Sequence, residues 1–130
     1  MLPSGGRVVE PLAGRHDRTR FDCGSAALDQ YLKRQARQDA QRFVAAPFVL
    51  IEPPDTRVLG YYTLSASNVD TSQIAPDLAK KLPRYPKLPV TLIGRLAVDV
   101  SVKGQRLGEF LLMDALNRSL QHAAEISAMA

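Results

Sequence analysis

The stretch VDVSVKGQRLGEFLLMDAL, residues 98–116, decides the expected fold. It opens as a run of β-branched residues, passes through a turn that contains Gly104 and Gly108, and closes with apolar residues at helical spacing. A strand, a glycine-bearing loop and a helix N-terminus bring backbone N–H groups and the positive end of a helix dipole to one point. Such a point binds anions, so we expect a phosphate-binding turn here.

Length and composition predict that residues 1–130 form one cytoplasmic domain. A chain of 130 residues is long enough to bury a core without disulfides. Its single cysteine, Cys23, cannot form an internal disulfide, and we find no signal peptide or membrane-length apolar run, so a reducing cytoplasm is expected. The 17 Lys and Arg against 13 Asp and Glu permit a nucleic-acid partner, although a solvated surface explains this mild excess as well.

Hydrophobic patterning predicts strands that alternate with helices. We expect helices over residues 24–43, with Ser25 as the N-cap, and 107–123. The expected strands cover residues 7–12, 47–52, 57–69, 90–100 and 125–130. The turn sequence PPDT makes the second and third of these strands a hairpin. The strand over 90–100 is apolar almost throughout, which is typical of a central strand covered on both faces.

The proline-rich segment 75–89 predicts a short helical turn followed by a loop, because each proline removes a backbone donor. Its basic residues either bind nucleic-acid phosphates or belong to an ordinary solvated loop; they are Lys80, Lys81, Arg84 and Lys87.

Several familiar chemistries do not fit the sequence. GQRLG lacks the spacing of a nucleotide P-loop and of a dinucleotide-binding motif. Cys23 as a nucleophile would need His16 or His122 as its base, and a small buried residue is the simpler interpretation. Two histidines and one cysteine at these separations give no zinc-ligand spacing, so we expect no metal.

Four blocks of sequence carry a family resemblance. SVKGQRLGEFLL after GRLAVDV is similar to the pyrophosphate-binding turn of the GNAT superfamily of acetyltransferases, Q/R-x-x-G-x-G/A between a strand and a helix. HDRTRFDCGSAALDQYLKRQARQD, GYYTLSASNV and LPRYPKLPVTLIGRLAVD resemble, in order and spacing, the TacT-like toxins of toxin–antitoxin pairs. The resemblance covers residues 7–130. It implies a GNAT-like α/β (α+β) fold, with a mixed, mostly antiparallel central sheet flanked by helices.

The resemblance also implies a function. Family members use acetyl-CoA as the acetyl donor, and the toxin branch acetylates the α-amino group of aminoacyl-tRNA, which stops translation. Aminoacyl-tRNA and a cognate antitoxin are therefore the expected partners, and no membrane is expected. One alternative stays open, namely a degenerate, non-enzymatic acetyltransferase fold that serves as a binding module for an antitoxin and DNA. Cofactor binding distinguishes the two hypotheses.

Position by position, the resemblance places two groups of residues at acetyl-CoA. The backbone of Leu96, Ala97 and Val98 would lie along the pantetheine arm as a further strand does. The turn that holds the pyrophosphate would comprise Lys103, Gly104, Gln105, Arg106, Leu107 and Gly108. Lys103 replaces the usual Gln or Arg, and Arg106 replaces the middle glycine of the motif. If that position needs a left-handed backbone, arginine costs about 1 to 2 kcal/mol there, and its charge beside the phosphates offsets this.

In the family, the strand at ISAMA is followed by a helix and final strands, which carry the tyrosine that protonates the CoA thiolate. We therefore expect a C-terminally incomplete domain that lacks those elements, and we assign no catalytic residue. The chain's own tyrosines, Tyr31, Tyr61, Tyr62 and Tyr85, lie in other blocks. For Tyr61 and Tyr62 we expect strand packing, one ring in the core and one facing the acceptor groove. The unfinished sheet and the apolar helix predict a homodimer.

Overall fold

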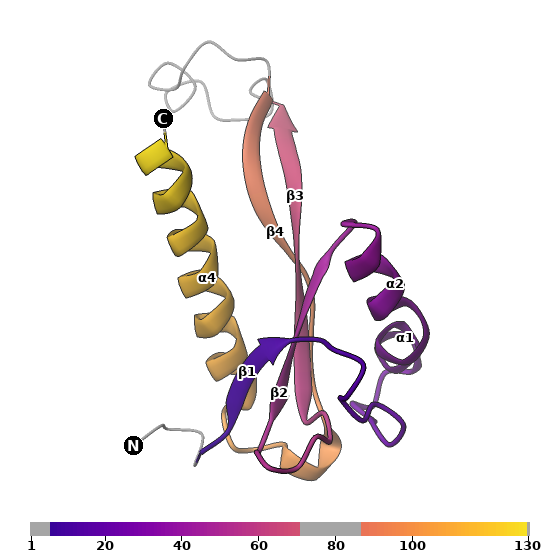
Figure 1. The fold of residues 1–130 in the computed structure, drawn as a ribbon. Coiled ribbons are helices and arrows are strands. Elements are labelled where there is room, and N and C mark those ends of the chain that lie inside the picture. Colours follow the sequence, from indigo (N-terminus) through magenta and orange to yellow (C-terminus); the bar gives the residue numbers. More distant parts are fainter. Residues whose placement is uncertain (1–5, 71–86, 130) are drawn as a thin grey trace.

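The computed structural model describes residues 6–70 and 87–129. Four strands form one antiparallel sheet in the order β1-β2-β3-β4 (Figure 1). The strands are β1 (Val8–Pro11), β2 (Ala46–Ile51), β3 (Gly60–Asp70) and β4 (Lys87–Val98). The helical elements are α1 (Ala26–Gln30), the π-helical turn η1 (Tyr31–Gln35), α2 (Ala36–Gln41), the short 3-10 helix η3 (Val100–Val102) and α4 (Leu107–Met129). This agrees with the mostly antiparallel, helix-flanked sheet that the family resemblance implies.

The helices cover opposite faces of the sheet. Figure 1 shows α4 along one face and the α1–α2 segment along the other, while β3 and β4 extend together beyond β1 and β2. Because side chains alternate along a strand, neighbouring tyrosines of β3 enter different cores. Tyr61 packs with Tyr31, Leu32 and Ala97 beneath the α1–α2 segment. Tyr62 packs with Leu50, Leu107, Leu111 and Ala115 beneath α4.

The first predicted helix and the predicted hairpin are confirmed. Residues 26–41 are helical, and the Ser25 hydroxyl accepts a hydrogen bond from the Leu28 N–H at 3.5 Å. Strands β2 and β3 pair antiparallel, with Val49 opposite Tyr61. The hairpin therefore fixes which residues of β3 face each core.

The predicted strand over 125–130 is wrong, because α4 continues from Leu107 to Met129 instead of ending at Ala123. The sequence contains no proline or glycine after Gly108, and Ala, Glu and Met all favour a helix. A short apolar run cannot be assigned to strand or helix from its periodicity alone.

Strand β4 also differs from its prediction. It begins at Lys87, inside the segment expected to be a loop, and within the described sheet it is an edge strand. Leu92 is 52% exposed, so β4 is not covered on both faces over the part of the chain that the structure describes. An edge strand tolerates Pro89, because a proline there need not remove a ladder hydrogen bond. The predicted helical turn lies outside the described residues. The same holds for Lys80, Lys81, Arg84 and Tyr85.

Gly60 lies at the start of β3, in close contact with both β4 and α4. A Cβ atom on Gly60 would lie 3.0 Å from the Ala97 carbonyl oxygen and 3.0 Å from Leu111 Cδ1. The carbonyl belongs to the sheet backbone and cannot move aside cheaply, so this position is restricted to glycine by space.

We predict that Gly60→Ala lowers the free energy of unfolding by about 1 to 3 kcal/mol, as overpacking does in other cores. Gly14→Ala is the matched control, since its Cβ would meet only the Arg37 side chain, at 3.7 Å or more. The control is expected to change stability by less than about 0.5 kcal/mol. Urea titration followed by circular dichroism measures both values, and an equal effect of the two substitutions would contradict the packing argument.

Candidate functional site

The turn from Lys103 to Gly108 joins η3 to α4. Gly104 (φ 86°) and Arg106 (φ 59°) both adopt left-handed backbone conformations. The Arg106 carbonyl accepts a hydrogen bond from the Phe110 N–H at 3.1 Å, at the start of α4. No described group accepts a hydrogen bond from the backbone N–H groups of residues 104–108, which therefore stay available at the positive end of the helix dipole. This is the geometry of an anion-binding turn.

The left-handed backbone that the family's middle glycine implies is thus present at Arg106. An arginine in this conformation costs about 1 to 2 kcal/mol relative to glycine. Its side chain is exposed, so the guanidinium stands free to meet an anion at the turn.

A hollow of about 400 Å³ opens at the turn. Six of the predicted cofactor residues line it, namely Val98, Lys103, Gly104, Arg106, Leu107 and Gly108. Gln105 is directed elsewhere, because its side-chain oxygen accepts a hydrogen bond from the Arg7 guanidinium at 2.5 Å. Leu96 and Ala97 pack in the cores on opposite faces of β4.

The backbone of Leu96, Ala97 and Val98 pairs with β3 on one side only. Val98 lies opposite Gly60, and Ala97 lies opposite Tyr61. Since β4 is an edge strand of the described sheet, its other side presents N–H and C=O groups to which an extended ligand can bond.

Asp99 fixes the end of β4, a role that the sequence patterns above do not predict. Its carboxylate accepts hydrogen bonds from the N–H groups of Asp22 and Ser101, each at 2.9 Å, and lies 3.4 Å from the Arg57 guanidinium. Burial opposes its charge, but the N–H groups of Ser101 and Asp22 outweigh this and lower the pKa of the carboxyl. The signal in the sequence is an acidic residue directly after an apolar strand, where it caps η3.

Tyr61 and Tyr62 are both fully buried, so the expectation that one ring faces an acceptor groove is wrong. The Tyr61 hydroxyl donates to the Leu28 carbonyl at 2.7 Å, and the Tyr62 hydroxyl donates to Asp114 at 2.5 Å. Burial raises the pKa of both phenols. Neither hydroxyl is placed to give a proton to a ligand, so the packing interpretation holds.

Cys23 has the environment of a structural residue. Burial, followed by a hydrogen bond with Asp29, raises the pKa of the thiol, which disfavours the reactive thiolate. His16 is buried, and both of its ring nitrogens have partners. Its Nδ1 accepts a hydrogen bond from the Ala13 N–H at 2.9 Å, and its Nε2 lies 2.6 Å from a Glu10 carboxylate oxygen. The side chain of His122 lies outside the described residues.

Within residues 6–70 and 87–129, no three His, Cys, Asp or Glu side chains gather as metal ligands would. Over the same ranges, no helix combines the length and apolar character needed to cross a bilayer.

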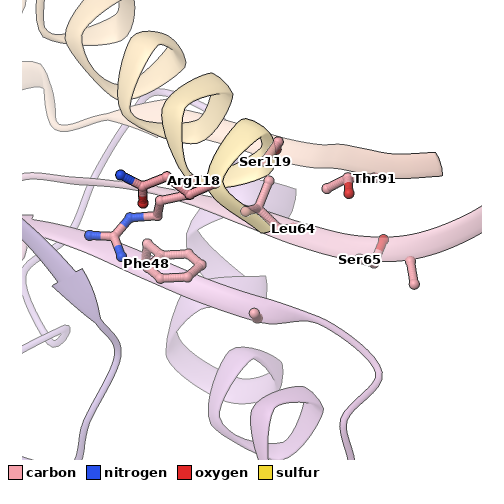
Figure 2. A pocket seen from close by; sticks show the side chains of 9 residues that line it. Phe48, Leu64, Ser65, Thr91, Arg118 and Ser119 are labelled. Carbon is pink, nitrogen blue, oxygen red and sulfur yellow. The ribbon is translucent and has the colours of Figure 1, made fainter. Parts of the chain in front are cut away.

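A second hollow, of about 350 Å³, lies between α4 and strands β2 to β4 (Figure 2). Figure 2 shows Arg118 reaching from α4 across the ring of Phe48, and its guanidinium carbon lies 4.5 Å from the ring centroid. Arg118 also bonds to Asp114 at 2.8 Å and to the Val9 carbonyl at 3.0 Å, so its charge serves to hold α4 on the sheet. None of the predicted cofactor residues lines this hollow.

No family model matches the chain, but curated relatives do. The chain is 32% identical over 127 residues to a tRNA-acetylating toxin of Mycobacterium tuberculosis, covering 98% of this chain and 74% of that toxin. It is 27% identical over 113 residues to a probable toxin TacT of Sinorhizobium fredii, covering 86% of this chain and 62% of that protein. The chain thus spans less than two thirds of the length of the Sinorhizobium fredii relative.

Solved structures of the toxin AtaT share the fold. AtaT complexed with acetyl-methionyl-tRNAfMet matches with a TM-score of 0.84 and 30% identity over 92% of this chain and 72% of AtaT. AtaTR bound with acetyl-CoA matches with a TM-score of 0.80 and 29% identity over the same shares. An AtaT variant bound to the C-terminus of the antitoxin AtaR matches with a TM-score of 0.74 and 29% identity, over 92% of this chain and 69% of the variant.

The identity to the Mycobacterium tuberculosis toxin extends along nearly the whole chain, and the fold agrees with that of AtaT. The chain therefore belongs to the GNAT-type tRNA-acetylating toxins, the family of TacT and AtaT.

Proposed function

We propose that this chain is an acetyl-CoA-dependent N-acetyltransferase that acetylates the α-amino group of aminoacyl-tRNA and thereby blocks translation. The observation that carries the proposal is the turn at the start of α4, where unpaired N–H groups and two left-handed residues form an anion site beside an open strand edge. The complexes of AtaT with acetylated methionyl-tRNA and of AtaTR with acetyl-CoA support the choice of donor and acceptor.

In this proposal the cofactor extends along two adjoining features. The N–H groups of residues 104–108 and the charges of Lys103 and Arg106 hold the pyrophosphate. The open edge of Leu96, Ala97 and Val98 bonds the amide groups of the pantetheine arm. The carboxylate of Asp99 ties the end of β4 to the loop before α1 through the Asp22 N–H, and it caps η3, which leads to the turn, through the Ser101 N–H.

The reaction itself needs few protein groups. The neutral amine of the acceptor attacks the thioester carbonyl, the C–S bond breaks, and the amine loses a proton while the CoA thiolate gains one. Open N–H groups along β4 would polarise the carbonyl and favour the tetrahedral intermediate. The hydroxyls of Tyr61 and Tyr62 are occupied in the cores, so we assign the proton transfer to neither.

The same proposal sets the partners and the location. Both acetyl-CoA and aminoacyl-tRNA are cytoplasmic, so the chain would act there. A cognate antitoxin is the expected protein partner, because an AtaT variant was solved with the C-terminus of the antitoxin AtaR.

We predict that the purified chain binds acetyl-CoA, as measured by titration calorimetry, and transfers acetyl groups to aminoacyl-tRNA, as measured by mass spectrometry. Deacylated tRNA is the control and should stay unmodified, because it has no α-amino group. Absence of heat at millimolar acetyl-CoA would contradict the cofactor site and favour the binding-module hypothesis. Binding without transfer would retain the site and overturn the enzymatic proposal.

The two effects of Arg106 can be separated by substitution. Arg106→Gly is expected to raise the free energy of unfolding by about 1 kcal/mol, because it relieves the left-handed strain. It should weaken acetyl-CoA binding about threefold to tenfold, because it removes a charge beside the pyrophosphate. Arg106→Gln keeps the strain, so it should weaken binding similarly without raising stability. Tighter binding by the glycine variant would show that strain, not charge, limits affinity.

We also propose that the chain forms a homodimer through α4. The exposed apolar side chains of this helix lie on one face and are 42–69% accessible; they are Leu112, Met113, Leu116 and Leu120. Apolar area of this kind favours association by about 25 cal/mol per Å² buried.

Sedimentation velocity across a concentration series tests the dimer, which we expect at tens of micromolar. Leu116→Glu should shift the chain toward monomer, because it would bury a charge in the interface. Val44→Glu places the same charge on an exposed residue outside α4 and should leave the dimer intact. A wild-type chain that sediments as a monomer would contradict the proposal.

A further inference from the structure

Arg95 is an exposed cation on β4 that no described residue neutralises. Its guanidinium carbon lies 3.6 Å from the centre of the Tyr31 ring. None of the described residues accepts a hydrogen bond from Arg95 or forms an ion pair with it. The charge of Arg95 nevertheless contributes to lowering the pKa of Asp39, after the hydrogen bonds from Gln35 and Tyr31. The guanidinium is therefore held by its face, while the N–H groups at its edge remain available.

The ring beneath Arg95 is itself fixed. The Tyr31 hydroxyl donates to Asp39 at 2.8 Å, and the ring stacks on Tyr61 with centroids 6.2 Å apart. The second oxygen of Asp39 accepts from the Gln35 side chain at 2.8 Å, so the carboxylate is satisfied without Arg95. Tyr31 is the first residue of η1, a π-helical turn, and such turns often occur at functional sites.

A bulge in β4 sets the direction of Arg95. Thr63 lies opposite Arg95 and Leu64 lies opposite Ile93, so Gly94 is the extra residue. The bulge puts Arg95 on the face of the α1–α2 segment, two residues before Ala97 on the same side of the strand. A Cβ on Gly94 would lie 3.1 Å from the Thr63 hydroxyl, so the bulge fits closely against β3.

The position of Arg95 matters because of the proposed cofactor path, on which this inference rests. If the pyrophosphate sits at residues 104–108, the pantetheine arm runs along β4 from Val98 toward Leu96. A strand advances by about 3.3 Å per residue, and Arg95 is the residue next to Leu96. The acetyl end of the cofactor then lies nearest to Arg95. The acceptor amine must reach the same place.

We infer that Arg95 binds a phosphate of the 3′-terminal nucleotides of the acceptor RNA. A planar guanidinium with free edge donors matches a phosphate, and a group stacked on a fixed ring loses little conformational freedom on binding. The residue would act as a positioning residue, which brings the amine to the thioester without taking part in proton transfer.

The test measures RNA binding as well as turnover. Arg95→Gln should weaken the binding of a fluorescently labelled, CCA-ended tRNA about tenfold in an anisotropy assay and reduce the slope of log K against log salt by about one. In acetylation assays it should raise KM for aminoacyl-tRNA and leave the calorimetric affinity for acetyl-CoA unchanged. Arg95→Lys should restore the salt slope but only part of the affinity, because an ammonium cannot make the paired contact.

Arg34→Gln is the matched control, since it removes the same charge from an exposed arginine of η1. An equal loss in this control, or unchanged RNA binding by Arg95→Gln, would overturn the inference. Either result leaves the proposed function standing if the wild-type chain still acetylates aminoacyl-tRNA. Loss of acetyl-CoA affinity in Arg95→Gln would also overturn it, because the residue would then serve the cofactor.

Discussion

The buried carboxylate of Asp99 is the contact on which the candidate site depends. It binds backbone from the loop before α1 through Asp22 and from the segment after β4 through Ser101. The Val100 N–H returns a bond to the Asp22 carbonyl at 2.8 Å, so the two segments are joined twice. Without this junction, the strand edge and the N–H groups of the turn would not keep one orientation. A carboxylate suits the task because it accepts several N–H bonds at once.

Side chains of β3 enter two hydrophobic cores, one on each face of the sheet, and each core supports a different part of the candidate site. The core beneath α4 fixes the helix whose first turn belongs to the candidate anion site. At its edge, Asp114 accepts hydrogen bonds from Tyr62 and Arg118. The core beneath the α1–α2 segment fixes Tyr31, and through it the face on which Arg95 stands. The cofactor side and the acceptor side of the proposed reaction are thus supported from opposite faces of one sheet.

The sequence predicts those features that local chemistry decides. Ser25 at a helix start, the PPDT turn, and the glycines before an amphipathic helix all act within a few residues, and the structure has each of them. The apolar run at 125–130 predicts a strand, whereas α4 continues to Met129, because a short apolar run fits both periods. Pro89 suggested a loop, since its tolerance in β4 depends on the strand being at an edge.

Two other features of the site could not be predicted from the sequence, for a different reason. The contact of Arg95 with Tyr31 joins residues 64 positions apart and depends on a bulge at Gly94 that shifts the register by one. The role of Asp99 likewise depends on a loop that is distant in the sequence. The contact of Arg95 with Tyr31 leaves no local signature, and the only local signal of Asp99 is that of a helix cap, because tertiary packing alone creates the long-range contacts.

The three buried tyrosines also determine how the protein responds to alkali. Burial raises the pKa of Tyr31 to about 12 and raises the pKa of Tyr61 and Tyr62 as well, with help from Asp39 at the first and Asp114 at the last. An unfolded chain ionises these phenols near pH 10, whereas the folded chain keeps them protonated. The stability that these three phenols contribute is therefore fully present below about pH 10 and is lost as the pH rises through their folded pKa values. Since the chain has no tryptophan, the tyrosinate absorption band of these rings appears together with loss of the fold.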